Sequence, residues 1–500
     1  MTREADRATL TYPDGTTVDR TYTDRGQLAG VARNSVTIDT RTYDDGGRLT
    51  ASAYNNGVSE SRTYNADNTL AGIAFTGAPI GDLSYAWDAN KNKTSEGISG
   101  AMTGYGFDVG TNGYDDEDRL INWNRDDNAL DQSWNLSLVG DWDSFTENAS
   151  VQPRTHGPTH ELLAASGQAV AHDAKGNQTL LPANLRSQTS SLTLSFDFEN
   201  KLLAADTDAD STDDVFYQFD AMGRRVARST AAGTTVYIQS GQQTIADYVL
   251  GALPASPTYT YYYASYIDEP VMRAGTGGLV YYHRNQQYSI IALTDGGGLI
   301  KERYAYTAYG EPTILDASLS PLATSAENNR YMYTGREWDE ELGLYHYRAR
   351  MYSAQTGRFC SRDPIGYVDG MSLYQSYFVL KGEDPSGQRF VGNVCPACFG
   401  DYQACSFRNG ANYAACLGGP SLVGELGCAG LCAWLGPSGP GFGICFSLCS
   451  LGNLAWFGLV TMTTCNEALE RESMNCGNDY NRCSYYRPRD ECCNENWRPD

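Results

Sequence analysis

Four tyrosines recur at one interval near the start of the chain, and this spacing constrains the fold more than any other feature. They are 21 residues apart, at Tyr22, Tyr43, Tyr64 and Tyr85. A leucine follows six positions after each of the first three, and turn formers such as Asp, Asn and Gly occupy much of the interval. Aromatic and aliphatic positions on either side of such a turn are typical of a β-hairpin. Because a unit of this length cannot bury an apolar face alone, neighbouring hairpins must pair into one continuous sheet.

Later segments keep the same chemistry with less regular spacing, over residues 114–120, 196–202 and 219–225. The chain of 500 residues has 52 Gly, which suit tight turns, and 35 Tyr, which suit a half-buried strand surface. Its 37 basic residues against 60 carboxylates give a net charge of −23, which disfavours a nucleic acid as partner. We therefore predict a mainly β fold of antiparallel hairpins over residues 1–300.

The repeated motif resembles the YD repeat of the RHS/YD-repeat family. Residues 329–366 are similar, almost position for position, to the RHS repeat-associated core domain, with Gly-Leu-Tyr-His-Tyr-Arg-Ala-Arg from 343 and Gly-Arg-Phe-Cys-Ser-Arg-Asp-Pro-Ile-Gly from 357. The resemblance implies that the sheet curls into a hollow shell that can enclose a toxic or cargo polypeptide. It also implies three regions, which are the repeats at 1–300, the core domain at 301–387 and a variable C-terminal domain at 388–500.

Four arginines of the core domain are expected to serve the structure, and these are Arg336, Arg348, Arg350 and Arg358. We expect each to pair with a nearby carboxylate or to stack on a tyrosine ring. Tyr, Arg and Gly alternate in this stretch because strands joined by tight corners need cross-strand aromatic pairs. The core domain would then act as a cap on a sheet whose open edge otherwise invites aggregation.

Two Asp-Pro-x-Gly elements begin at Asp363 and Asp384. The resemblance implies self-cleavage just beyond the second element, near residue 388. Two carboxylates brought together could act as base and acid in the manner of an aspartic protease, and Arg362 could hold one of them ionised. The alternative is that both elements are ordinary turns. Residues 378–382 and Gln388 depart from the family pattern, which favours the alternative.

Cysteine use divides the chain, because 13 of the 14 cysteines follow residue 387. That density is typical of a disulfide scaffold in an oxidising compartment, and it is favoured over metal binding at the lone Cys395–Cys398 spacing. Two motifs of the form C-x-x-D-Y-x-x-C and two i, i+4 pairs place sulfurs on one helical face. The disulfide candidates are Cys398, Cys405, Cys476, Cys483, Cys428, Cys432, Cys445 and Cys449.

The segment 388–500, which we expect to be mostly α-helical, contains no histidine and no lysine. The missing histidine excludes an HNH-type nuclease, a His-pair ribonuclease and a His-x-Glu zinc deaminase. Two apolar stretches, 421–435 and 441–461, are separated by a Gly/Pro-rich turn. A buried helical hairpin pinned by disulfides is favoured for them, and insertion of 441–461 into a membrane is the alternative.

The loop that starts at Asp206 opens like a calcium loop, with Asp208 and Asp210 at alternate positions. Ser211 stands where such a loop needs Gly, and Tyr217 stands where it needs Glu. We therefore predict an acidic turn and assign neither a metal nor a cofactor to the chain.

The cysteine-rich tail indicates an extracellular or cell-surface protein, although the first residues contain no apolar signal segment and the start is expected to be truncated. Two functions follow. The first is a shell protein with a structural or interaction role, whose partners are its own C-terminal tail as cargo, a cell-surface protein, a carbohydrate or a membrane. The second is a contact-dependent polymorphic toxin, nuclease-type by family analogy or membrane-active, whose tail is released by aspartate-dependent self-cleavage. The absent histidines favour the first.

Overall fold

The computed structural model describes residues 7–368, 370–380 and 382–388, and the disulfide candidates and apolar stretches of the tail lie outside them. The described residues form three antiparallel sheets of 16, 15 and 4 strands, each with its strands in chain order. This order confirms the prediction of a mainly β fold built from successive hairpins.

The first sheet contains β1 (Arg7–Thr11), β2 (Thr17–Tyr22), β3 (Leu28–Arg33), β4 (Val36–Tyr43), β5 (Leu49–Tyr54), β6 (Ser59–Tyr64), β7 (Leu70–Thr76), β8 (Leu83–Trp87), β9 (Lys93–Ile98), β10 (Phe107–Asp108), β11 (Asn122–Arg125), β12 (Asp131–Leu136), β13 (Trp142–Glu147), β14 (Ser150–His156), β15 (Leu162–Ala165) and β16 (Gln168–Ala169). Three 3₁₀ turns are η1 (Gly100–Tyr105), η2 (Ala183–Leu185) and η3 (Tyr333–Gly335).

The second sheet contains β17 (Ala171–His172), β18 (Gln178–Leu181), β19 (Leu192–Phe196), β20 (Leu202–Asp206), β21 (Val215–Phe219), β22 (Arg225–Thr230), β23 (Gly233–Ser240), β24 (Gln243–Val249), β25 (Tyr259–Tyr263), β26 (Pro270–Gly275), β27 (Gly278–Arg284), β28 (Ile290–Asp295), β29 (Ile300–Tyr306), β30 (Pro312–Asp316) and β31 (Pro321–Leu322). The third contains β32 (Glu337–Asp339), β33 (Leu344–Tyr347), β34 (Arg350–Ser353) and β35 (Arg358–Phe359).

The repeated tyrosine and leucine face each other across each early hairpin. Tyr43 pairs with Leu49, and Tyr64 pairs with Leu70, in both cases at a shift of the strand register. The tyrosine hydroxyl also reaches the previous hairpin, because Tyr64 Oη donates to the backbone oxygen of Leu49 at 2.8 Å. The repeat therefore joins successive hairpins through side chains as well as through the strand ladder.

The fourth hairpin departs from the 21-residue interval. Trp87 occupies the position of the repeated tyrosine, because it pairs with Lys93 at the register shift and its indole Nε1 donates to the Leu70 backbone oxygen at 2.7 Å. Tyr85 is instead buried, and its hydroxyl accepts a bond from the Gln286 amide at 3.1 Å. The expectation that Tyr85 is the fourth repeated aromatic residue was therefore wrong, because Trp87, two positions later, takes that place. Side chains two positions apart lie on the same face of a strand, so Tyr85 and Trp87 share a face.

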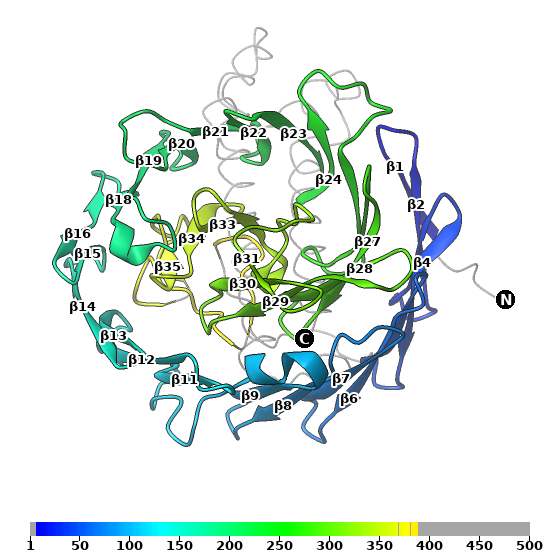
Figure 1. Cartoon of the computed structure of the whole chain (residues 1–500), viewed down its shortest axis with the longest axis horizontal. Helices are drawn as coiled ribbons and strands as arrows, with labels where there is room; N and C mark the ends of the chain where they lie inside the picture. Colours follow the sequence, from blue (N-terminus) through cyan, green and yellow to red (C-terminus); the bar gives the residue numbers. More distant parts are fainter. Residues whose placement is uncertain (1–6, 369, 381, 389–500) are drawn as a thin grey trace, which may run out of the picture. The chain divides into compact units, whose positions relative to one another are not determined.

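The later strands of the second sheet lie against the first strands of the first sheet. Figure 1 shows β24, β27 and β28 along the inner side of β1, β2 and β4. The Tyr12 and Tyr262 rings stack at 5.5 Å between centroids, and Tyr12 Oη donates to the Tyr261 backbone oxygen at 2.6 Å. Both layers contribute to one buried apolar cluster that includes Val18, Ile73 and Val271. The repeats thus bury their apolar face against another stretch of the same repeats.

The four-stranded sheet β32–β35 lies between other strands, as the yellow strands of Figure 1 show. Tyr345 and Tyr347 belong to a cluster with residues of β25 and β27–β30, whereas Leu344 and Met351 belong to a second cluster with residues of β15 and β18–β21. Alternate residues of each strand therefore pack in opposite directions. The sheet is covered on both faces, and this burial positions the site described below.

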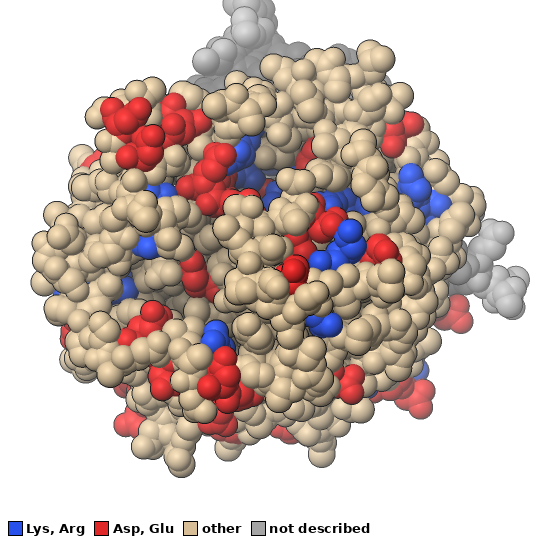
Figure 2. Space-filling model, in the orientation of Figure 1, with Lys and Arg blue, Asp and Glu red and all other residues tan. Residues whose placement is uncertain are grey.

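Carboxylates are spread over the face shown in Figure 2, in keeping with the net charge of −23. None of the helices in the described ranges has the length and apolar character needed to cross a membrane.

Candidate functional site

The two Asp-Pro-x-Gly elements meet at one arginine. Asp363 follows β35, and Arg350 opens β34, the strand next to it. The Arg350 Nη2 atom lies 2.9 Å from Asp363 Oδ2 and 3.5 Å from Asp384 Oδ2. All three side chains are at most 8% exposed. The structure thus brings the two predicted aspartates together, with a buried guanidinium between them.

Arg350 also contacts the chain on either side of these aspartates. Its Nε donates to the Gly387 backbone oxygen, and its Nη1 donates to the Leu373 backbone oxygen at 3.2 Å. The guanidinium carbon stacks 3.6 Å from the centre of the Phe359 ring. The expected pairing of Arg350 with a carboxylate is confirmed, but its contact with both aspartates was not anticipated. To predict this contact, one would need to know that Arg350 lies on the strand beside Asp363. The spacing of residues in the sequence alone does not reveal this.

The peptide bond between Gly387 and Gln388 is held at both of its ends. Arg350 binds the carbonyl oxygen, and Asp384 Oδ1 accepts a hydrogen bond from the Gln388 amide nitrogen at 3.1 Å. Gly387 has φ of +67°, and a Cβ atom there would collide with the Tyr347 backbone oxygen. Only glycine satisfies both conditions, so this position brings the chain unusually close to the core sheet.

The segment that leads to Asp384 is fixed from the repeat layer. Gln287 Nε2 donates to the backbone oxygens of Phe378 and Gly382, at 3.2 and 3.0 Å. Lys93 donates in turn to Gln287 Oε1 at 3.3 Å. The second element therefore depends on contacts with β9 and with the turn that follows β27.

Arg362 does not take the role that its position beside Asp363 suggested. Its guanidinium binds Glu161 Oε1, and its Nε lies 3.1 Å from the Tyr374 hydroxyl. Burial raises the pKa of Glu161, but hydrogen bonds from Thr159 and Arg362 outweigh it, and the pKa falls to about 2. The described contacts of Arg362 thus connect the first Asp-Pro-x-Gly element to the first sheet. The arginine that lies between the two aspartates is Arg350.

The other core arginines pair as expected. Arg336 and Arg348 both bind Asp268, at 2.7 and 2.5 Å, and Arg358 binds Asp141 at 3.0 Å. These contacts confirm the expected pairing of the three residues with carboxylates.

Cys360, two residues after β35 begins, is a free thiol in an apolar cluster with Leu344 and Met351. Burial raises its pKa to about 12. An uncharged thiol at this depth is a poor nucleophile.

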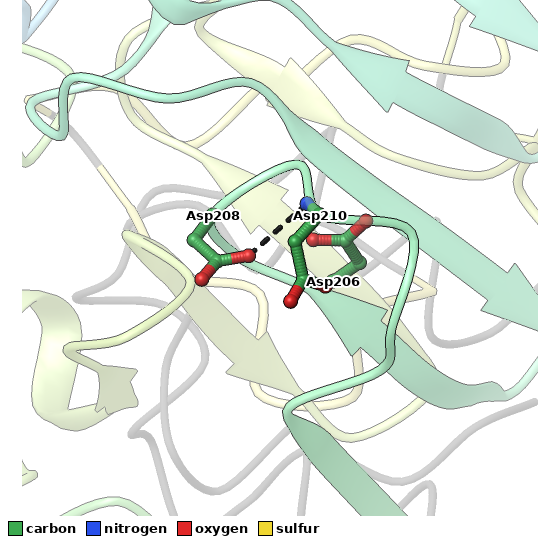
Figure 3. Close-up of side chains that lie close together, drawn as sticks. All are labelled: Asp206, Asp208 and Asp210. Carbon is green, nitrogen blue, oxygen red and sulfur yellow. Dashed lines mark hydrogen bonds between the residues drawn. The ribbon is translucent and has the colours of Figure 1, made fainter.

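Asp206, Asp208 and Asp210 lie close together, with carboxylate oxygens within 4.8 Å of one another (Figure 3). The turn itself uses these oxygens, since the Ala209 and Ser211 amides donate to Asp206 and the Asp210 amide donates to Asp208. The contacts are those of a self-capped acidic turn.

Known proteins are similar to parts of this chain. No family model matches it. The tRNA3(Ser)-specific nuclease WapA of Bacillus spizizenii is 28% identical over 262 residues, which are 52% of this chain and 10% of that protein. The chain thus spans about a tenth of the length of that curated relative.

Two solved structures share the fold. The Tc holotoxin pore of Photorhabdus luminescens superposes with a TM-score of 0.58 at 19% identity, over 77% of this chain and 21% of that one. TcdB2-TccC3 without its hypervariable C-terminal region gives a TM-score of 0.58 at 18% identity, over 77% and 20%. The fold is that of these toxin structures. Together with the WapA similarity, it supports the RHS/YD-type shell that the repeats and the core stretch indicate.

Proposed function

We propose that this protein is an RHS/YD-type shell that carries residues 388–500 as a variable cargo domain and releases them by cutting its own chain near Gln388. The observation that carries the proposal is the contact of Arg350 with both aspartates and with the Gly387 carbonyl oxygen. Similarity to a Tc holotoxin pore supports an extracellular or cell-surface location for the chain.

The contacts suggest a role for each group in hydrolysis. Asp363 takes a proton from a water molecule that attacks the Gly387 carbonyl carbon. Arg350 stabilises the negative charge that develops on the carbonyl oxygen. The bond to the Gln388 nitrogen then breaks, and the proton that Asp363 took from the water passes to the departing amine. Asp384 Oδ1, which accepts a hydrogen bond from that nitrogen at 3.1 Å, orients the leaving group. The products are a carboxylate at Gly387 and a free amine at Gln388.

The released segment is not assigned the nuclease activity of WapA. Residues 388–500 contain no histidine and no lysine, so His-based nuclease chemistry has no candidate residue there. Membrane activity through 441–461 and binding through a disulfide scaffold remain the two proposals for this segment.

The second candidate function is a shell that presents its tail without cutting it. It is favoured by the contacts themselves, because each aspartate pairs with the Arg350 guanidinium, whereas the two carboxyl groups of an aspartic protease share a proton.

The intact mass of the purified, reduced full chain separates the two functions. We expect the parent to give two fragments whose masses locate the cut bond at or just beyond Gly387. Asp363→Asn and Asp384→Asn should each leave one uncut chain. Asp220→Asn, which alters a repeat-turn aspartate paired with Arg224, is the matched control and should be cut like the parent.

A parent chain that stays whole, or cleavage that persists in both site variants, would reject self-cleavage. The first result would favour the presenting shell, and the second would point to an external protease.

A further inference from the structure

A small cavity lies where the β23–β24 turn meets β32 and β33, and its volume is about 30 Å³. Most of its lining residues are polar or charged. The charged residues are Arg224, Arg225, Arg336, Arg348, Asp268 and Glu337. His346, three glutamines, a threonine and two tyrosines complete the polar lining, and these last six are Gln239, Gln242, Gln243, Thr244, Tyr263 and Tyr331.

His346 faces this cavity without a hydrogen-bond partner for either ring nitrogen among the residues that the structure describes. The residue is only 7% exposed. Burial and the nearby Arg225 hold its pKa well below the usual value, so the ring is neutral at neutral pH. A neutral imidazole has one donor and one acceptor, and leaving both unpaired in a buried site is costly. The ring therefore indicates that something polar occupies the cavity.

The charges around the cavity do not balance. Arg336 and Arg348 share a single carboxylate, Asp268, at 2.7 and 2.5 Å. Arg225 binds Glu337, which also lies 3.4 Å from Arg330.

Arg224, which also lines the cavity, and the neighbouring Arg330 each pair with a carboxylate outside the lining. Arg330 binds Asp247, and Arg224 binds Asp220. Three buried arginines of the lining therefore face two carboxylates, and the Nε of Arg336 has no partner in the described part of the chain. A buried excess of positive charge is unfavourable unless an anion offsets it.

We propose that this cavity binds one small oxoanion from solution, held by His346 and by the guanidinium groups of Arg225, Arg336 and Arg348. A water molecule could satisfy the imidazole but would leave the extra positive charge uncompensated. One water needs about 10–15 Å³ of such space, so the cavity has room for a small anion in place of two waters. The anion takes no part in the proposed cleavage chemistry, although Arg348 also donates to the Pro385 backbone oxygen of the second Asp-Pro-x-Gly element.

The anion has a route from solution. Gln242 lines the cavity and is exposed at the β23–β24 turn. The backbone of the same residue accepts a hydrogen bond from Arg348 Nε at 3.1 Å. The rim of the cavity is thus formed by a turn in contact with solvent, and the arginines lie directly beneath it.

Calorimetric titration of the full chain with inorganic phosphate, in a low-salt zwitterionic buffer, tests the site. We expect saturable binding with one phosphate per chain. His346→Leu removes both ring nitrogens at similar volume, and we expect at least a tenfold loss of affinity. Gln242→Glu places a carboxylate at the rim, and we expect it to weaken phosphate binding by a comparable factor.

His283→Gln is the matched control, since His283 is also buried with an unpaired Nδ1 but does not line the cavity. It should bind phosphate like the parent. Circular dichroism of each variant establishes that it is folded. Absence of saturable binding in the parent would overturn the proposal, and so would equal affinity in the parent and in folded Gln242→Glu.

Discussion

At the scale of single residues, Arg350 joins the parts of the candidate site through several contacts at once. It binds two carboxylates and two backbone oxygens and stacks on Phe359. This requires the planar fork of a guanidinium, because each of its nitrogens points in a different direction. A lysine would supply the charge at a single point only. The geometry of the site therefore depends on arginine chemistry rather than on positive charge.

We predict that Arg350→Lys reduces self-cleavage at least tenfold while leaving the shell folded. The reason is that lysine cannot bind Asp363, Asp384 and the Gly387 oxygen together. Fragment yield over time, read by intact mass, measures the effect. Arg358→Lys is the matched control, since it alters another buried core arginine, paired with Asp141. Equal loss of cleavage in the two variants would mean that general damage to the core explains the result.

His283 is a buried neutral histidine, with Nε2 at 2.8 Å from Thr294 Oγ1. Burial lowers its pKa to about 3, from an ordinary value of 6.5. The unfolded chain therefore binds a proton at this residue at pH values where the folded chain does not. Its contribution to stability is complete above pH 6.5 and is lost as the pH falls toward 3, at about 1.4 kcal/mol per pH unit.

We predict that His283→Gln flattens the dependence of the melting temperature on pH between 6.5 and about 4. Glutamine can keep the bond to Thr294 but does not titrate. Differential scanning calorimetry of parent and variant at several pH values measures this change. Parallel curves for the two proteins would contradict the assigned titration.

At the scale of elements, the repeat turn is held by its aspartate and arginine. Asp44 Oδ1 accepts a bond from the Arg48 amide at 2.8 Å, and Oδ2 binds the Arg48 side chain at 2.7 Å. Asp115 with Arg119, and Asp220 with Arg224, repeat this arrangement. The position before the arginine has positive φ, as in Gly47 at +82°. The Asp and Gly of the motif therefore serve one tight turn.

We predict that Asp44→Ala destabilises the β4–β5 hairpin by about 1 kcal/mol, because the turn loses a hydrogen bond to a charged group while the partly exposed ion pair adds little. Amide hydrogen exchange should accelerate in β4 and β5 and stay unchanged in β27–β30. Asp45→Ala, which changes the exposed neighbour, should leave exchange as in the parent.

At the scale of the whole described unit, the two layers of repeats are joined by a buried ion network. Arg41 of β4 binds Glu269, just before β26, at 2.5 Å, and Arg284 of β27 binds the same carboxylate. Arg284 also lies 3.8 Å from Glu60 of β6. Each of these side chains is at most 2% exposed. Such a network favours one alignment of the layers, because any shift would leave buried charges unpaired.

We predict that Glu269→Gln destabilises the unit by about 3–5 kcal/mol at neutral pH, because Arg41 and Arg284 lose a shared carboxylate. Burial opposes ionisation of Glu269, but the two arginines lower its pKa to about 2. Its contribution is therefore complete above its ordinary pKa of 4.5 and is lost as the pH falls toward 2.

Thermal melts test this prediction, and the difference between parent and variant should shrink between pH 5 and pH 3. Glu199→Gln, at an exposed carboxylate, should melt like the parent at each pH. A constant difference from pH 7 to pH 3 would show that the carboxylate charge does not stabilise the layers.

The hairpins, their turns and the mainly β fold could be predicted from the sequence, because all three depend on local chemistry. A turn of Asp, Asn and Gly followed by a leucine specifies its own hairpin, and alternation along a strand specifies its buried face. The two aspartates of the candidate site could also be named, since each begins a recognisable Asp-Pro-x-Gly element. Even here the spacing misplaced one unit, where Trp87 rather than Tyr85 takes the repeated position.

Only the tertiary structure decided which groups meet. Arg362 is the chain neighbour of Asp363, but neighbouring residues in an extended segment point in opposite directions, and Arg362 reaches Glu161. Arg350 reaches Asp363 because its strand lies beside β35. In the same way, Arg41 meets Glu269 across 228 positions of sequence. A repeating hairpin pattern determines each unit and its neighbour, whereas contacts between layers depend on how tightly the whole sheet curves, which no local pattern specifies.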